Sequence, residues 1–428
     1  MRSKLFCIAC LSVMIGCCAN SFGQDTLSLT LPQAEQRFLQ KNFVLLAQKF
    51  NVNLAEAAVE QAKLWDNPNL QVELNAYNPN TGGVFPLTNA TGDPNNPSGG
   101  AYMFQLQQMI NLAGRRSKLV SLSQTGVELQ QAAFQDLMRS LRFQLAQSFG
   151  NLSTEQKQMK MLQLEEKQIS TLLTAFKAQL TLGVIPEYEV TRLELEQKNL
   201  GSAVKNLSDQ ISQDQATLRI LLVQNGQTYI EGVIEDKQEV SPLPSLNQLL
   251  ESAYANRPDL QVADKSVLYN KQNLTYQKAL ATPRLMLGAD YQRFGSAYPS
   301  FWGLQAAMDL PWKNRNQGNI QAAKIGIEQS GQNLNQAKLQ VEQDVTSAYQ
   351  QLQHTLALKS TFTPDYIQRI QEVSKNATDN YAKRTIDLIS FIDKIRAYKD
   401  AQLNMIDLDN QLFQTQQQIN FVTNTKTF

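Results

Sequence analysis

Two long heptad patterns, 200 residues apart, constrain the fold of this chain more than any other feature. Apolar side chains recur every seven residues in both segments: Val120, Val127, Phe134 and Leu141, then Ile320, Ile327, Leu334 and Val341. Such spacing is typical of the seam of a coiled coil. Glycine and proline are nearly absent from Ser117–Leu182 and Asn319–Lys383, so each segment predicts one helix of roughly 100 Å. A single globular domain does not contain rods of that length.

The segments around the two rods follow the same order. A shorter helical pattern precedes each rod, over 33–64 and 245–280, and a return helix follows each, over 187–222 and up to about 422. The sequence therefore predicts an internal two-fold repeat of long coiled-coil helical hairpins. From the N-terminus, the expected parts are a signal peptide (1–23), the first repeat (24–224), a connector (225–244), the second repeat (245–422) and a C-terminal tail (423–428).

Four segments between the short and long helices alternate apolar and polar side chains: Asn69–Tyr77, Tyr102–Gln107, Arg284–Gln292 and Trp302–Leu310. Alternation of this length is typical of a transmembrane β-strand. Two ordinary hairpins, half-buried on a soluble domain, would give the same periodicity. Four strands are too few to close a barrel, and an open sheet edge is not viable in lipid. A membrane role therefore requires strands from several chains.

The N-terminus has the pattern of a secretory signal, because Arg2 and Lys4 precede the short apolar stretch Leu5–Gly16. We expect cleavage after residue 23. The alternative is a lipoprotein-type signal with acylation of Cys17. All four cysteines lie in this leader, so cleavage leaves a chain without any thiol. The net charge then changes from +1 to −1, because two basic residues and no acid are removed.

Composition and motifs exclude several classes of protein. With 42% hydrophobic residues the chain is not disordered, and beyond the leader no apolar run approaches the ~20 residues of a spanning helix. The near-zero net charge argues against nucleic-acid binding. The sequence holds one histidine, His354, and shows no nucleophile–base set, phosphate loop or metal-ligand spacing. We therefore expect no enzyme, no cofactor and no metal site.

Three stretches carry a resemblance to a known family: Asn67–Leu70, Gln105–Arg116 and, most specifically, Asp309–Gly318. In the last, a strand that ends in Leu-Pro is followed by Arg-Asn-Gln-Gly and a long helix. With the doubled architecture, this pattern resembles the outer membrane efflux proteins of the TolC type. Within them it is similar to the heavy-metal branch of CzcC and CusC.

The resemblance implies a mainly α fold with a transmembrane β-barrel in the bacterial outer membrane, and a helical tunnel in the periplasm. It implies a homotrimer, in which three chains of four strands each close the barrel. Its expected partners are a periplasmic adaptor (a membrane fusion protein), an inner-membrane pump of the resistance-nodulation-division type and outer-membrane lipid. The function implied is a passive exit duct for heavy-metal cations. A channel for type I secretion or drug efflux would share the fold, and a periplasmic coiled-coil scaffold is a more distant alternative.

The resemblance also points to the ends of the helical hairpins as the surface that meets the adaptor: Gly183, Val184, Ile185 and Pro186 in the first, and Arg384, Thr385, Ile386 and Asp387 in the second. The alternative is a pair of turns selected for geometry alone, since glycine ends helices and proline begins them. Val184 and Ile185 are apolar at an end that we expect to be exposed, and this favours docking of the adaptor. The second turn departs from the family by having Arg384 where a glycine is usual.

Two acidic residues near these ends, Glu189 and Asp393, resemble those of the family's periplasmic constriction. In a trimer, a carboxylate that faces the lumen becomes a ring of three, and such rings favour cations. The alternative is a solvated helix face with local ion pairs, such as Glu189 with Arg192 and Asp393 with Arg396 or Lys394. A pair between Arg384 and Glu189 across the hairpins is a further expectation from the resemblance.

Overall fold

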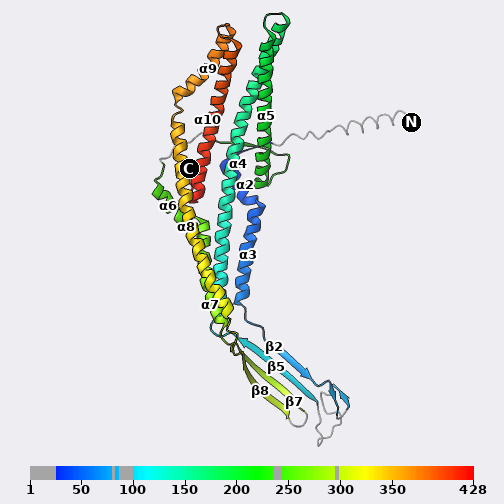
Figure 1. Ribbon diagram of the computed structural model, residues 1–428. Helices are drawn as coiled ribbons and strands as arrows, with labels where there is room; N and C mark the ends of the chain where they lie inside the picture. Colours follow the sequence, from blue (N-terminus) through cyan, green and yellow to red (C-terminus); the bar gives the residue numbers. More distant parts are fainter. Residues whose placement is uncertain (1–25, 80–81, 86–99, 235–242, 295–297) are drawn as a thin grey trace, which may run out of the picture. The chain divides into compact units, whose positions relative to one another are not determined.

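The structure, a computed structural model, describes residues 26–79, 82–85, 100–234, 243–294 and 298–428 and is predominantly helical (Figure 1). The chain divides into two compact units, and each combines segments from both halves of the sequence. One unit consists of Met1–Leu46, Leu137–Arg257 and Val341–Phe428, and the other of Ala47–Asp136 and Pro258–Gln340. None of the described helices is both long and apolar enough to cross a membrane.

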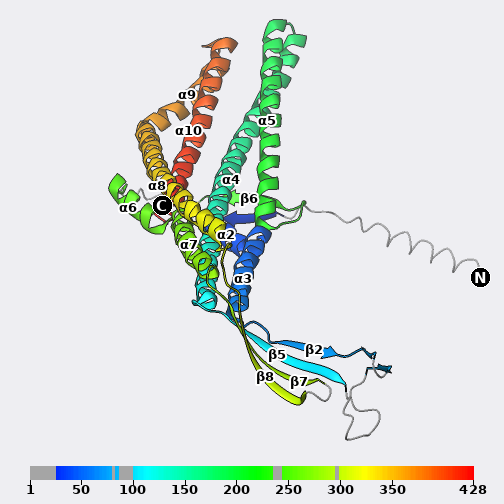
Figure 2. The same ribbon diagram turned by 60° about the horizontal axis from the view of Figure 1, so that its bottom comes forward.

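The first predicted rod is confirmed as the continuous helix α4 (Arg115–Thr181), which is followed by α5 (Glu187–Leu222). Beyond Leu137, α4 runs beside α5 as a helical hairpin (Figure 2). The final helix α10 (Leu388–Thr423) packs against α4 so closely that a Cβ at Gly150 would lie 2.7 Å from the ring of Phe413. Only glycine permits this approach of the two helices.

The prediction of one continuous second rod is wrong. Its helix α8 (Gln317–Ser360) ends before a short break, and α9 (Pro364–Ala382) begins anew, so that the chain bends between them (Figure 1). Pro364 has no N–H for a preceding carbonyl, and its ring excludes continuation of the helix. Thr363 instead caps α9 by accepting a hydrogen bond from the N–H of Tyr366 at 3.2 Å. The break follows directly from this Thr-Pro pair.

The four alternating segments form one antiparallel sheet. Its strands are β2 (Asn69–Leu74), β5 (Ala101–Ile110), β7 (Leu285–Phe294) and β8 (Tyr298–Met308), in that order. Each hairpin follows a short helix of its own half, α3 (Phe43–Lys63) or α7 (Pro258–Leu280). Pairing of β5 with β7 joins the two halves of the sequence. Strands β3 (Tyr77–Asn78) and β4 (Gly83–Val84) form a separate short pair.

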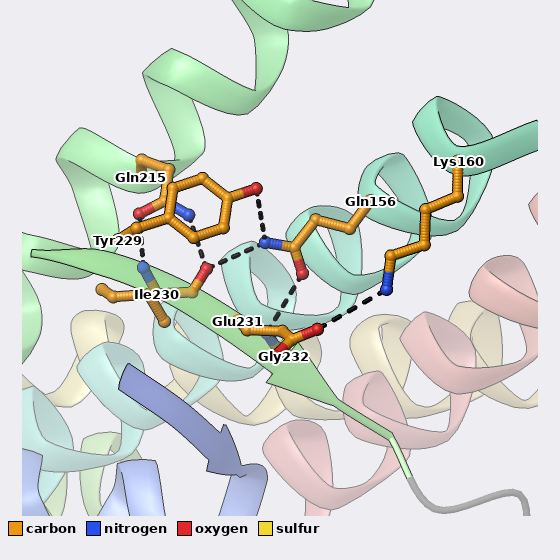
Figure 3. A network of polar contacts seen from close by, with 7 residues as sticks. All are labelled: Gln156, Lys160, Gln215, Tyr229, Ile230, Glu231 and Gly232. Atoms are coloured by element: carbon orange, nitrogen blue, oxygen red, sulfur yellow. Dashed lines mark hydrogen bonds and ion pairs between the residues drawn. The ribbon is translucent and has the colours of Figure 1, made fainter. Parts of the chain in front are cut away.

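The connector between the two halves contributes β6 (Tyr229–Val233), which pairs in parallel with β1 (Thr26–Thr30). Helices α2 (Leu31–Lys41) and α6 (Leu246–Asn256) belong to the same unit. Two buried glutamines bind the other edge of β6 (Figure 3). Gln215 hydrogen-bonds both the N–H and the C=O of Ile230, at 2.9 and 2.6 Å, and Gln156 accepts from the N–H of Gly232 at 3.1 Å. Their amides replace a missing neighbouring strand and fix the connector to α4 and α5.

Candidate functional site

The turn between α4 and α5, here called the first turn, has the geometry that ends many helices. Gly183 has a φ of 70°, and its N–H donates to the carbonyl of Leu180 at 2.9 Å. The N–H of Val184 donates to the carbonyl of Gln179 at 2.9 Å. These two bonds define a Schellman motif, in which glycine adopts the left-handed conformation without steric cost. Pro186 then sets the start of α5 without any side-chain cap.

The turn between α9 and α10, the second turn, has the same backbone. Arg384 has a φ of 57° and donates its N–H to the carbonyl of Tyr381 at 2.9 Å, while Thr385 donates to Asn380 at 2.9 Å. Arginine thus takes the conformation that glycine takes in the first turn, at a cost of roughly 1–2 kcal/mol. Asp387 caps α10 by accepting from the N–H of Ser390 at 2.7 Å. Arginine in place of glycine at position 384 has therefore not changed the backbone geometry of the turn.

The two turns present different side chains. In the first turn Leu182, Val184 and Tyr188 are 77%, 54% and 63% exposed. The expectation that Ile185 is exposed is wrong, because its half-buried side chain packs inward. In the second turn the exposed residues Lys383, Arg384, Thr385 and Asp387 are polar, and Ile389, at the position equivalent to Tyr188, is an apolar residue that is 49% exposed. Tyr188 was not among the residues predicted for this surface, although an apolar residue beside a helix break was the available signal.

One apolar core, the tip core, underlies both turns. It consists of eight buried residues from four helices: Leu173, Phe176, Val190, Leu193, Ala377, Leu388, Phe391 and Ile392. Ile185 of the first turn and Ile386 of the second pack against it from equivalent positions. Tyr381 stacks on Phe391 with 4.7 Å between ring centroids. The tip core therefore holds the ends of the two hairpins together.

The predicted gate residues have different surroundings. Glu189 is half-buried, and its carboxylate accepts from the Tyr188 hydroxyl at 3.5 Å. Burial raises the pKa of Tyr381 to about 12; the nearby charge of Glu189 adds to this rise, and that of Arg384 reduces it. Glu189 is thus brought close to groups of the second hairpin. Asp393, in contrast, lies on an exposed part of α10.

The principal partner of Arg396 lies on the other hairpin. Arg396 donates from its Nε to Oε2 of Glu196 at 2.8 Å, and the charge of Asp393 acts on it only secondarily. The charge of Arg192 acts on Asp387 of the second turn, whose pKa is lowered mainly by its hydrogen bonds with Ser390. Periodicity could not reveal these partners, because they are distant in the sequence.

A buried carboxyl lies near the Glu196–Arg396 pair. Glu165, on α4, is buried, and burial raises its pKa to about 7; the positive charge of Lys399 opposes this rise, and the negative charges of Glu196 and Asp400 add to it. No group of three or more His, Cys, Asp or Glu that could hold a metal ion occurs in the described ranges. Cys17 and the predicted cleavage site lie outside them.

Known proteins share both sequence and fold with this chain. It is 20% identical over 387 residues to the cobalt-zinc-cadmium resistance protein CzcC of Cupriavidus metallidurans, covering 90% of this chain and 88% of that protein. The fold is similar to that of CusC, with a TM-score of 0.68 and 16% identity over 92% of this chain and 91% of the other. The CmeC outer membrane channel of Campylobacter jejuni gives a TM-score of 0.73 at 12% identity, over 93% and 87% of the two chains.

A family model settles the assignment. The model for outer membrane efflux proteins matches residues 35–223 and 249–425, which include the tip core, both turns and the four-stranded sheet. Members of this family are efflux channels and not enzymes. The chain belongs to the outer membrane efflux protein family.

Proposed function

We propose that this protein is the outer-membrane exit duct of a tripartite efflux system and acts as a homotrimer. Three four-stranded sheets close one transmembrane β-barrel, and the helical hairpins of the two repeats form a tunnel in the periplasm. The observation that carries the proposal is a sheet with two open edges, β2 and β8, and one exposed apolar face. Neighbouring copies remove the open edges, and lipid covers the apolar face.

The composition of this apolar face supports a membrane role. Its exposed members, in three successive cross-strand rows, are Leu70, Val72, Leu74, Phe104, Leu106, Trp302 and Leu304. Leu304 is 92% exposed. Aromatic rings gather towards one end of this face. There the ring centroid of Tyr291 lies 4.9 Å from that of Trp302 and 6.2 Å from that of Tyr102. An apolar band edged by aromatic residues is typical of outer-membrane barrels.

Two neighbouring residues of β2 test this arrangement. Val72→Arg places a charge on the face that we assign to lipid, which costs about 2–4 kcal/mol at the bilayer midplane and less towards the aromatic end of the face. Glu73→Arg places the same charge on the opposite face, which we assign to the lumen, and should be milder. Outer-membrane yield of folded protein should fall strongly for the first variant only. Equal yields would contradict the assignment of the two faces.

We propose that the first turn is the main contact for the periplasmic adaptor, which links the duct to the inner-membrane pump. Leu182, Val184 and Tyr188 are exposed, although a free turn is normally polar. The second turn, with Arg384, Thr385 and Asp387, supplies a polar rim to the same contact. Ile185 and Ile386 support the turns from below.

The double variant Leu182→Asp/Val184→Asp tests docking without disturbing the tip core. Burial of new carboxylates in an interface is costly, so efflux-dependent resistance and crosslinking to the adaptor should both be lost. Leu195→Asp is the matched control, because Leu195 is an exposed leucine of α5 outside the turn. Normal resistance and crosslinking in a well-expressed double variant would contradict docking at the first turn.

The cargo that we propose is heavy-metal cations, by analogy with the cobalt, zinc and cadmium named for the relative CzcC. A duct conducts such ions without chelating them. Deletion of the gene should sensitise cells to these metals more than to organic drugs. Sensitivity to drugs alone, or loss of one secreted protein, would instead favour the drug-efflux or type I secretion alternative. Recovery of the protein in the soluble periplasmic fraction would favour the coiled-coil scaffold.

We further propose that Glu189 and Asp393 narrow the periplasmic end of the trimer. Their carboxylates would form rings of three, which favour cations and repel anions. Glu189 is the better placed of the two, because its charge acts on Tyr381 of the second hairpin. Glu189→Gln should reduce cation preference of the reconstituted channel, and Asp393→Asn should do so less. The reverse order would contradict this ranking.

A further inference from the structure

The second face of the sheet, here called the polar face, has an uneven distribution of charge. Among the described residues of the paired strands, its ionisable members are Glu73 on β2 and Asp290 on β7, without any lysine or arginine. The remaining polar members are neutral: Asn69, Gln71, Gln105, Gln107, Gln292 and Gln305. Within the described, paired part of the strands, this face therefore carries two acidic residues and no basic one.

Asp290 is held in place by glutamine side chains of its own and a neighbouring strand. It is 3% exposed. Its Oδ1 accepts from Nε2 of Gln305 at 3.2 Å, and its Oδ2 accepts from Nε2 of Gln292 at 3.2 Å. Gln105, on β5, in turn donates to Oε1 of Gln305. The network covers the carboxylate and joins β5, β7 and β8.

The strand opposite Asp290 is shaped to admit its carboxylate. Gly303 of β8 is the cross-strand partner of Asp290. A Cβ built at Gly303 would lie 2.4 Å from Oδ1 of Asp290, much closer than two such atoms can approach. Every residue other than glycine would displace the acid from this position. A glycine in a strand weakens the sheet, so its presence here indicates that the carboxylate requires the space.

We infer that Asp290 is a cation-selectivity residue within the β-barrel of the duct. The inference rests on the proposed function, which places the polar face towards the lumen and repeats Asp290 three times around it. A ring of fixed carboxylates attracts cations and repels anions. Asp290 is desolvated and held by neutral amides, so salt screens its charge less than that of the exposed Glu73. Asp290 therefore acts on passing ions through its field, whereas Glu73 acts as a screened surface charge.

The test uses purified full-length trimer in planar lipid bilayers across a KCl gradient. The wild-type channel should be cation-selective, as measured by its reversal potential. Asp290→Asn keeps the size of the side chain and removes the charge, so the ratio of cation to anion permeability should fall several-fold. Glu73→Gln is the matched control on the same face, and its smaller effect should disappear at high salt.

A second variant tests the effect of the same charge if Asp290→Asn does not assemble. Gln71 is exposed and lies in the same cross-strand row as Gln105 and Asp290. Gln71→Lys should therefore lower cation selectivity by opposing the charge of Asp290. An unchanged reversal potential in an inserted Asp290→Asn channel, or in Gln71→Lys when the first variant does not assemble, would overturn the inference and leave the proposed duct intact. Absence of any conductance from the wild-type trimer would overturn the proposed function itself.

Discussion

The first and second turns share a backbone and differ in almost every side chain. Both end a helix with a left-handed residue, and both place an isoleucine, Ile185 or Ile386, against the tip core. The first turn obtains its geometry from Gly183 and Pro186, and exposes apolar residues. The second has Arg384 in the left-handed position and an acidic cap. The backbone hydrogen bonds alone thus define the turn. The side chains that point outward can therefore vary and form a contact with a partner protein.

Removal of a side chain from the tip core should give the largest effect on both turns. Leu193 is 0% exposed, whereas Leu195, two residues later on α5, is 60% exposed. Leu193→Ala should cost about 2–5 kcal/mol. Leu195→Ala should change stability by less than about 0.5 kcal/mol. Hydrogen exchange at both turns measures the cost, because ends of hairpins open locally. Faster exchange at only one turn would show that the two do not share a core.

The stability of the protein should depend on pH through the buried carboxyl of Glu165. Since the folded state raises the pKa of Glu165 to about 7, it keeps a proton that the unfolded chain loses near 4.5. Stability should therefore fall as the pH rises between these values. Glu165→Gln should remove this fall and stabilise the protein by up to about 3 kcal/mol at pH 8. Urea unfolding should show no such gain at pH 4, and an equal gain at both values would contradict the assignment.

The left-handed residues should respond in opposite directions. Arg384→Gly relieves a conformation unfavourable for arginine and should stabilise the second turn by roughly 0.5–1 kcal/mol, after allowance for the flexibility of glycine. Gly183→Ala should destabilise the first turn by about 1 kcal/mol, although the space around it is open. Hydrogen exchange of the peptides at each turn distinguishes them. Loss of stability in Arg384→Gly would indicate that the arginine makes a contact that outweighs its strain.

The cap of the second turn should give the smallest effect. Hydrogen bonds with Ser390 lower the pKa of Asp387, so its stabilising contribution is present at neutral pH and declines as the pH falls through the folded-state value. Asp387→Asn retains an acceptor for the N–H of Ser390 but does not titrate. The second turn of the variant should therefore lose less protection on acidification than that of the wild type. Pro186 provides no such cap, so the first turn should show no counterpart.

Periodicity predicted the elements better than their ends. Heptads identified α4, helical patterns after the breaks identified both return helices, and alternation identified the strands. Pro364 was overlooked within a long heptad pattern. A single proline ends a helix even where the apolar pattern continues. The exposure of Ile185 was predicted wrongly, because position in a turn does not reveal the direction of a side chain.

Contacts between distant segments could not be read from the sequence. Glu196 and Arg396 belong to different hairpins, and neither lies in a motif. Asp290 and Gly303 gave only an ordinary alternation, in which a glycine opposite an acid has no local signature. The family resemblance supplied the expected architecture of the channel, and physical contacts led to the residues that we propose tune its selectivity.

The stoichiometry of the purified protein shows whether several chains share one barrel. Light scattering on detergent-solubilised protein gives the mass of the complex free of bound detergent, and circular dichroism reports whether its helices and strands are intact. A trimer is expected, because each chain contributes four strands with two open edges. A monodisperse monomer with its full helical and strand signal would contradict the account of a shared barrel.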